Sequence, residues 1–573
     1  MKKISKQLLI GLAAICAASA TWADKGDVIL SVSGMAVKLD NGLAHFDFAA
    51  DASAKVVGTD EVNLVDRLSG AGRDPSRLRS FHLDYNSRGV TRFQPESLKV
   101  IEQQPERAHV AWIERQGKLD LEYHLIMEKG EPGLYSYVLA KNSHSEPLLV
   151  SELRTIYRFN PAILDHLYTL QGSSKPPLYG ELEKMPFIQD ETWRLADGYA
   201  YSKYNLVDYQ RKNEFWGAYG NGYGAWFIPV NHDYYSGGPL KQDLMVHQDA
   251  IVLNYMTGAH MGTPDMMAPP GWQKLYGPWL VYLNKGAPNS VISDARKHAE
   301  YIKKRWPFTW VQDANYPLQR FTVDGKLGNR QGEAFNVVLS PQAGDPEMQT
   351  LGFLYATVSD TNGAFKLSAV RPGSYWLTVY SATGYDQGIL LQNEVKIDQN
   401  GFHLGEFDLP AAKKYVWHIG VADKTAAGFK FAEKPRNVDW ADQVPADLVF
   451  NVGQQTDGDW YYAQTQPGDW KIFYTEEQIV GTRILNLAFA STSSSGTQKP
   501  ASPKLAVMVN GQKIADIAYS NDKSIYRGSV LNGQYHNESI TIPEGVLHKG
   551  KNEIVLRVLG GAFMYDAINL EQK

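Results

Sequence analysis

Hydrophobic and polar residues alternate along much of this chain, as they do in strands that bury one face. Segments 109–113 and 119–125 follow this period of two. Asn41 and Gly42 separate two further apolar segments, 37–39 and 43–46, and predict a hairpin turn. Glycine-rich turns continue to about residue 284. The pattern therefore predicts an all-β fold.

One helix interrupts the strands. Residues 293–305 contain good helix formers, with Ser293 or Asp294 as the N-cap and Pro307 beyond the end. We expect this helix to close a large domain. Two further β-domains follow, because alternation resumes after residue 316 and a jelly-roll-like pattern fills the last third of the chain. The predicted division is 1–23 as a targeting segment, 24–312 as a large β-sandwich, 313–411 as a smaller sandwich and 412–573 as a jelly roll.

The first residues have the features of a secretory signal. Three lysines precede a short apolar segment, 8–18, and Ala23 ends a plausible cleavage site. The only cysteine, Cys16, lies inside this segment, so the mature chain has no disulfide. No later segment is apolar enough to span a bilayer. We therefore expect a secreted, extracellular protein without membrane association, with the periplasm as the alternative.

Charge and motifs exclude several functions. The chain has 57 Lys and Arg against 62 Asp and Glu without a strongly basic block, so nucleic acid is not expected as a partner. Aromatic residues make up 12%, which suits a carbohydrate-facing protein but also any β-rich protein. No metalloprotease, P-loop or nucleophile-elbow motif occurs. Asp457 and Asp459 are more typical of a solvated turn than of a calcium site, although a structural Ca²⁺ stays open.

Charged and aromatic residues gather in one ordered set of short motifs. The motifs are Glu152-Leu153-Arg154, Tyr201-Ser202-Lys203-Tyr204, Gly237-Gly238-Pro239, Tyr255-Met256-Thr257-Gly258-Ala259-His260 and Gly277-Pro278-Trp279-Leu280-Val281-Tyr282, with Tyr526-Arg527-Gly528 near the end. In this order they resemble the rhamnogalacturonan endolyases of polysaccharide lyase family 4. The resemblance covers essentially the whole mature chain and is densest between residues 154 and 282.

The resemblance implies a fold, an activity and roles for residues. It implies a galactose-mutarotase-like β-sandwich, a fibronectin-III-like domain and a carbohydrate-binding-like jelly roll. It implies cleavage of the rhamnose–galacturonate backbone of rhamnogalacturonan I. We expect a monomer that needs no cofactor for catalysis. Lys203 and His260 match the family's catalytic lysine and histidine, and Arg154 and Arg527 match arginines that bind the substrate. Tyr255 matches one of two active-site tyrosines, and the position of the other holds Leu253.

The residue types suit β-elimination. A base removes the C5 proton of a galacturonate, an acid protonates the departing O4, and arginines stabilise the charge that develops at the carboxylate. We expect Lys203 to be the base, with its pKa lowered by burial and neighbouring arginines, and His260 to be the acid. The reversed assignment is nearly as good, because histidine titrates near neutral pH.

Other interpretations stay open. Taken alone, a lysine on a β-face is usually solvated, a histidine is usually structural, and Arg154 would serve in an ion pair with Glu152 or Asp165. A glycoside hydrolase would need two carboxylates about 5–10 Å apart, for which Asp243 and Asp249 are the candidates by proximity in sequence. A pectin-binding protein that has lost activity is the third class.

Overall fold

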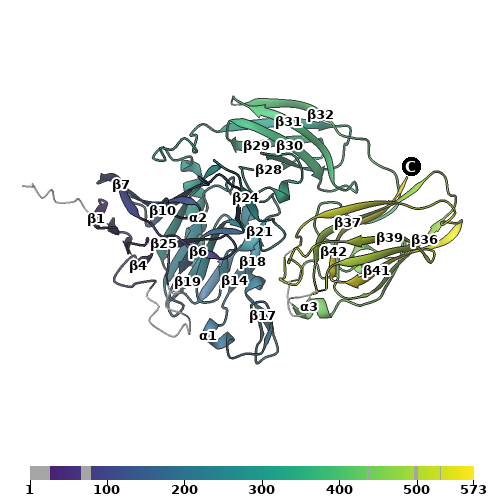
Figure 1. The fold of residues 1–573 in the computed structure, drawn as a ribbon, viewed down its shortest axis with the longest axis horizontal. Helices are drawn as coiled ribbons and strands as arrows, with labels where there is room; N and C mark the ends of the chain where they lie inside the picture. Colours follow the sequence, from purple (N-terminus) through teal and green to yellow (C-terminus); the bar gives the residue numbers. More distant parts are fainter. Residues whose placement is uncertain (1–25, 66–78, 400, 435–437, 496–500, 530) are drawn as a thin grey trace, which may run out of the picture.

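The chain forms three β-rich bodies in its computed structural model (Figure 1). The structure describes residues 26–65, 79–399, 401–434, 438–495, 501–529 and 531–573. The large purple-to-teal body carries the smaller green body on one side and lies beside the yellow C-terminal body. These strands confirm the predicted all-β class. The expected signal, residues 1–23, lies outside the described residues, and no described helix is long and apolar enough to cross a membrane.

The large body is built on two antiparallel sheets. One contains, in spatial order, β14 (Gly172–Ser174), β13 (His166–Thr169), β19 (Trp216–Gly220), β20 (Tyr223–Ile228), β25 (Gln273–Lys285), β10 (Gly133–Lys141), β9 (Asp120–Glu128), β8 (Arg107–Glu114) and β7 (Ser97–Gln104). The other contains β22 (Val246–His247), β23 (Ile251–Gly258), β12 (Glu152–Arg158), β5 (His82–Asn86) and β6 (Val90–Arg92). Trp279 of the first sheet donates its indole N–H to the Tyr157 hydroxyl of the second at 2.7 Å, so the two sheets share one core.

Smaller elements surround these sheets. They are the sheet β1 (Ile29–Ser33), β2 (Ala36–Asp40), β3 (His45–Phe48), β4 (Ala54–Gly58), the pairs β11 (Leu148–Val150) with β24 (Met266–Ala268) and β18 (Val207–Tyr209) with β21 (Gln242–Leu244), and the sheet β15 (Phe187–Gln189), β16 (Thr192–Arg194), β17 (Ala200–Ser202). Short helices are α1 (Tyr179–Leu182), η2 (Lys203–Leu206) and η3 (Gln210–Lys212). The strands β2 and β3 flank Asn41 and Gly42, which confirms the predicted hairpin.

The one long helix begins earlier than expected. α2 runs over Pro288–Arg305 and packs its apolar face on β19, β20 and β25. Pro288 suits a first turn, because its fixed φ fits the helix and its missing N–H needs no partner there. Asp294 does not cap the helix; its carboxylate accepts hydrogen bonds from the Tyr282 hydroxyl at 2.6 Å and from Asn284 at 2.8 Å. The prediction of the N-cap was therefore wrong.

The other two bodies are sandwiches. The second pairs β29 (Ala364–Val370), β26 (Phe321–Gly328) and β32 (Phe402–Asp408) with β28 (Tyr355–Val358), β27 (Phe335–Ser340), β30 (Gly373–Ser381) and β31 (Ile389–Ile397), and η4 is Pro346–Met348. The third pairs β33 (Tyr415–Gly420), β42 (Ala562–Gln572), β37 (Arg483–Ser493), β40 (His536–Thr541) and β35 (Ala463–Gln464) with β34 (Leu448–Asn451), β36 (Gly468–Glu476), β41 (Gly550–Gly560), β38 (Lys504–Val509) and β39 (Gln512–Ala518). It also holds α3 (Val438–Asp442) and η5 (Asp457–Asp459). In η5 the Asp459 carboxylate accepts the Thr456 backbone N–H at 2.9 Å, so it serves as a local cap.

Candidate functional site

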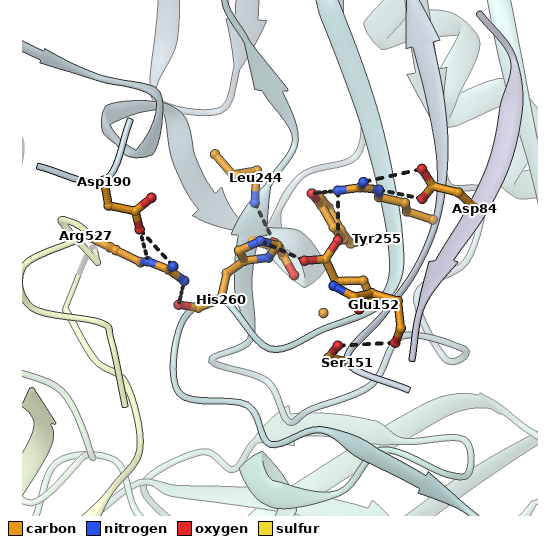
Figure 2. Close-up of polar contacts among 12 residues, drawn as sticks. Asp84, Ser151, Glu152, Asp190, Leu244, Tyr255, His260 and Arg527 are labelled. Atoms are coloured by element: carbon orange, nitrogen blue, oxygen red, sulfur yellow. Dashed lines mark hydrogen bonds and ion pairs between the residues drawn. The ribbon is translucent and has the colours of Figure 1, made fainter. Parts of the chain in front are cut away.

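The five-stranded sheet fixes the guanidinium of Arg154. This residue lies on β12 between Asp84 of β5 and Tyr255 of β23. Its Nε donates to Asp84 Oδ1 at 2.7 Å, and its Nη1 donates to the Tyr255 hydroxyl at 2.7 Å. Nη1 also lies 2.8 Å from Glu152 Oε2. Figure 2 shows Asp84, Tyr255 and Glu152 converging on this group. The expected ion pair of Arg154 with Glu152 is present, whereas Asp165 pairs elsewhere.

The charges of this cluster stabilise one another. Burial alone would raise the pKa of the Asp84 carboxyl, but the adjacent Arg154 cation and His82 together outweigh burial and hold that pKa well below its usual range. Burial also opposes the charge on Arg154, yet Tyr255, Asp84 and Glu152 together raise the pKa of its guanidinium. Arg154 is therefore a permanent cation in a fixed orientation.

His260 follows β23 and lies between two carboxylates. Its Nδ1 is 3.1 Å from Asp243 Oδ1, and its Nε2 is 3.4 Å from Glu152 Oε1. The edge of its ring meets the Tyr255 ring at 5.0 Å between centroids. Its side chain is 11% exposed, so a small part of the imidazole reaches the surface. Both ring nitrogens therefore face oxygen acceptors, an arrangement that favours an imidazole able to donate hydrogen bonds.

Asp243, the partner of His260, also forms an ion pair with Lys241. Asp243 and Lys241 are both fully buried, with Lys241 Nζ 3.0 Å from Asp243 Oδ2. Burial raises the pKa of Asp243, but the charges of Lys241 and His260 outweigh it and lower that pKa to about 2. This carboxylate cannot meet a substrate, because no part of it reaches the surface. It fixes the imidazole instead, and the hydrolase hypothesis loses one of its two carboxylates.

Lys203 lies at the start of η2. The side chain of Ser202 accepts the backbone N–H of Tyr204 and so begins this turn. Lys203 is half-buried, and its Nζ lies 5.0 Å from the centre of the Tyr204 ring. Burial lowers the pKa of the Lys203 amine; Glu191 and Asp190 oppose this effect, while Arg527 and Arg154 reinforce it. A larger fraction of the Lys203 amine is therefore neutral than in an ordinary lysine.

Arg527 comes from the C-terminal body. Its Nε lies 2.9 Å and its Nη2 2.8 Å from Asp190 Oδ2, and its Nη1 donates to the His260 carbonyl at 3.4 Å. Its guanidinium also lies over the Tyr204 ring, 4.9 Å from the centroid. The Tyr204 hydroxyl donates to the same Asp190 carboxylate at 3.2 Å. Figure 2 shows the Asp190–Arg527 pair beside His260. Two domains therefore form this site.

A buried carboxylate shapes the loop that carries Arg527. Asp522 accepts hydrogen bonds from the hydroxyls of Ser491 and Ser493 on β37, at 2.7 and 2.6 Å. It also accepts the backbone N–H groups of Ser524 and Gln534, each at 2.9 Å. Both ends of the loop 524–534 are thereby held to one point of the third body.

Asn532 fastens the same loop to the large body. Its side-chain oxygen accepts hydrogen bonds from Gln242 Nε2 at 2.7 Å and from the Tyr209 hydroxyl at 3.1 Å. Its Nδ2 donates to the Leu240 carbonyl at 3.3 Å. A further bond joins Gln189 to the Tyr526 carbonyl at 2.9 Å, next to Arg527. These bonds determine where Arg527 lies relative to His260.

The structure brings all five candidate residues together. Arg154 contacts Tyr255, whose ring contacts His260; His260 meets Arg527, and Arg527 shares the Tyr204 ring with Lys203. Leu253, at the position of the second tyrosine, is buried in the cluster that contains Tyr204 and Tyr255.

The sequence did not reveal most of the aspartates that pair with the candidate site residues. Asp84 and Asp190 carried no signal, because each comes from a segment distant from its arginine in sequence. Asp243 was considered only as a hydrolytic carboxylate. Among the described residues, no group of three or more His, Cys, Asp and Glu side chains is arranged to hold a metal ion.

The chain is similar to proteins of one family along nearly all its length. Models described as polysaccharide lyase family 4, domain II and domain III, match residues 330–401 and 415–570. The first is a fibronectin-III-like model and the second a carbohydrate-binding-module-like model, which confirms the expected character of the second and third bodies.

Similar whole chains have names that agree with those models. A protein of Dickeya dadantii named rhamnogalacturonate lyase is 49% identical, over 96% of this chain and 95% of that protein. One of Aspergillus fumigatus, named probable rhamnogalacturonate lyase B, is 24% identical over 78% of this chain and 81% of its own. Among solved structures, a galactose mutarotase-like protein from Lactobacillus casei covers 44% of this chain and all (100%) of its own at 10% identity, with a TM-score of 0.26.

Proposed function

The chain belongs to polysaccharide lyase family 4, and from this premise we propose that it cleaves the rhamnose–galacturonate backbone of rhamnogalacturonan I by β-elimination. The observation that carries the mechanism is the convergence of Lys203, His260 and two arginines at one domain junction. These groups supply a base, an acid and carboxylate-binding cations.

β-Elimination needs two groups on opposite faces of the sugar. The C5–H bond breaks and its electron pair forms the C4–C5 double bond, while the C4–O4 bond breaks and O4 leaves with the adjoining rhamnose. In galacturonate, H5 and O4 lie on opposite faces of the ring, so the group that takes the proton differs from the group that protonates O4. Lys203 and His260 come from different segments, η2 and the loop after β23, which suits that division.

Lys203 is the base in this proposal. A base must be neutral to accept the C5 proton, and an ordinary lysine, with a pKa of about 10.4, is almost fully protonated at neutral pH. Burial and the charges of Arg527 and Arg154 lower the pKa of Lys203, so a larger fraction of the amine is neutral.

His260 is the acid. Its Nδ1 faces the buried Asp243 carboxylate, which holds that nitrogen as a donor. Its Nε2 faces Glu152 at 3.4 Å, a distance from which O4 of a bound sugar can take over as the acceptor. The proton of Nε2 then passes to O4 as the C4–O4 bond breaks.

The arginines stabilise the carboxylate as negative charge develops on it. Removal of the C5 proton gives an enolate-like dianion, which cations beside the carboxylate stabilise. Nε and Nη2 of Arg527 are held by Asp190, while Nη1 has, among the described residues, a single hydrogen bond, the 3.4 Å contact with the His260 carbonyl. This Nη1 is the donor best placed to turn to a substrate carboxylate, and Arg154 adds a fixed positive charge.

The test is ultraviolet absorbance during incubation with debranched rhamnogalacturonan I. Absorbance from a conjugated 4,5-double bond is expected with the wild-type protein, and the Lys203→Ala variant should lose it by about 10²-fold or more. The control is Lys184→Ala, which changes an exposed lysine and is expected to retain full activity. A buried lysine such as Lys241 would be a poor control, because its loss would also destabilise the fold. New reducing ends without absorbance would instead indicate a hydrolase, and an intact polymer a binding protein.

We further propose that catalysis needs no metal ion and that the enzyme acts as a secreted monomer. The two arginines take the role that a metal cation would otherwise have beside the carboxylate of the substrate. Unchanged activity in a chelator, a monomer mass in solution and a mature N-terminus after Ala23 are the expected results. Loss of activity in the chelator, restored by Ca²⁺, would contradict the first of these.

A further inference from the structure

The two carboxylates beside the His260 imidazole differ in exposure. Asp243 is fully buried and paired with Lys241, so it cannot contact a sugar. Glu152 is 18% exposed, and its Oε1 lies 3.4 Å from His260 Nε2, the nitrogen that faces O4 in the proposed mechanism. Of these two carboxylates, Glu152 is therefore the one that can meet the sugars joined by the bond that breaks.

The strand β12 directs Glu152 and Arg154 to the same face. They are two residues apart, and Leu153 between them is buried in the core of the large body. Glu152 Oε2 lies 2.8 Å from Arg154 Nη1, and this ion pair holds the carboxylate beside His260 (Figure 2). The two oxygens of Glu152 have different partners. A sugar oxygen can thus replace Oε1 at His260 Nε2 while Oε2 stays on Arg154, so the carboxylate remains next to the bound sugar.

Arg154 compensates the charge of Glu152 only in part. The same guanidinium donates to Asp84 through Nε at 2.7 Å and Nη2 at 3.4 Å. One positive charge therefore serves two carboxylates, and these three side chains together carry one negative charge. Asp84 is buried, so Glu152 is the carboxylate of this group that reaches the surface.

A carboxylate can accept a sugar hydroxyl but has no proton to donate. Glu152 can therefore accept a hydrogen bond from a neutral sugar, whereas a carboxylate on that sugar would meet a like charge. In rhamnogalacturonan I the sugar that leaves with O4 is the neutral rhamnose, and in homogalacturonan it is a second galacturonate. The carboxylate of the galacturonate that loses its C5 proton is common to both polymers, so it does not affect this comparison. Repulsion of the wrong substrate is an established source of specificity.

We propose that Glu152 determines the specificity for the leaving sugar: its negative charge disfavours a uronate on the leaving side of the bond and so directs cleavage to a neutral sugar there. This inference rests on the proposed function, because it takes His260 as the group that faces O4. It adds a role for Glu152 that the elimination itself does not require.

The test compares rhamnogalacturonan I with polygalacturonate as substrates of the full-length protein, through the absorbance of the unsaturated product. The readout is the ratio of kcat/KM for the two polymers, from which a general loss of activity cancels. The wild-type protein should favour rhamnogalacturonan I by about 10²-fold or more. Glu152→Gln keeps the size of the side chain, but its neutral amide can donate to a carboxylate. The ratio should therefore fall by about tenfold or more.

Two further variants separate charge from shape and position. Glu152→Asp keeps the negative charge, so its ratio should stay near that of the wild type while its rates on both polymers fall. Glu300→Gln changes an exposed glutamate of α2 and alters the net charge by the same amount as Glu152→Gln. It should leave the ratio unaltered.

Three results would overturn this inference: similar wild-type kcat/KM values for the two polymers, a Glu152→Gln ratio equal to that of the wild type, or an equal fall of the ratio in Glu152→Asp. The third result would show that the charge is not the cause. Failure of the proposed function has a separate signature. If the wild-type protein forms no unsaturated product from rhamnogalacturonan I, both proposals fail; if it does and the ratio behaves as in any of the three results, this inference alone fails.

Discussion

At the scale of single residues, burial and the charges around Lys203 determine its pKa. Lys203 is half-buried between two acids, Asp190 and Glu191, and two arginines, Arg527 and Arg154. The acids favour the protonated amine and the arginines favour the neutral one, so the fraction of Lys203 that is neutral depends on their balance.

This balance predicts opposite shifts for two variants. Arg527→Gln removes a positive charge, so the pKa of Lys203 should rise and the ascending limb of kcat/KM against pH should move to higher pH. Glu191→Gln removes a negative charge, so that limb should move to lower pH. The pH–rate profiles of both variants measure this, independently of any change in maximal rate. Shifts in the same direction would show that another group sets the limb.

The buried Lys241–Asp243 pair gives a second prediction at this scale. Asp243→Leu leaves Lys241 charged and unpaired, so the free energy of unfolding should fall by about 3–5 kcal/mol. The double variant Lys241→Met/Asp243→Leu should recover most of that stability, because an apolar pair replaces the ion pair. Both should remain about 10²-fold slower than wild type, since His260 lacks its partner. Denaturant unfolding and kcat measure the two effects; recovery of activity in the double variant would show that Asp243 has no role in orienting His260.

At the scale of elements, one loop of the third body completes the site. Residues 524–534 are tied to β37 through Asp522 and to the large body through Asn532. These bonds support Arg527, whose own polar contacts are to Asp190 and the His260 carbonyl.

Loss of the Asn532 bonds should misplace Arg527 without unfolding the third body. Because small displacements of a catalytic group cost up to about 10²-fold in rate, Asn532→Ala should lower kcat by about 10- to 100-fold. Asn552→Ala is the matched control: its Nδ2 donates to the carbonyls of His548 and Gly550 within the third body. The control should reduce thermal stability but leave kcat near wild type. Equal kcat losses in the two variants would count against a positioning role for Asn532.

At the scale of the whole molecule, buried ion pairs join the three bodies. Asp233 of the large body pairs with Arg371 of the second at 2.9 Å, and Lys424 of the third pairs with Asp345 of the second at 2.9 Å. Burial raises the pKa of Asp233, but Arg371 and Arg320 outweigh it, so that pKa is lowered. The resulting stability is present above the ordinary aspartate pKa of about 3.9 and is lost as pH falls through the lowered value.

Breaking this interdomain pair should destabilise both bodies. Arg371→Gln leaves Asp233 buried without its cation, and the free energy of unfolding at neutral pH should fall by about 3–5 kcal/mol. The exposed pair of Lys326 with Glu406 is the control, and Lys326→Gln should change stability by about 1 kcal/mol or less. Calorimetry measures both. A small effect of Arg371→Gln would mean that solvent reaches Asp233.

The sequence by itself determined local structure and residue chemistry. Alternation predicts β9 and the β2–β3 hairpin because side chains on a strand change face at every residue, and each strand reports its own buried face. The motifs around Lys203 and His260 could be read from the sequence because each is short and contiguous. The start of α2 was missed, because its N-cap residue, Ala287, makes no side-chain capping hydrogen bond.

Only the tertiary structure decided which charges meet. Asp84 pairs with Arg154, and Asp190 with Arg527, across long stretches of sequence, and no local pattern records such a partner. The same holds for Asp243, whose burial beside Lys241 makes it a support for His260 instead of a hydrolytic acid. Charge interactions depend on distance and burial, both of which arise only when strands from different segments and domains pack together.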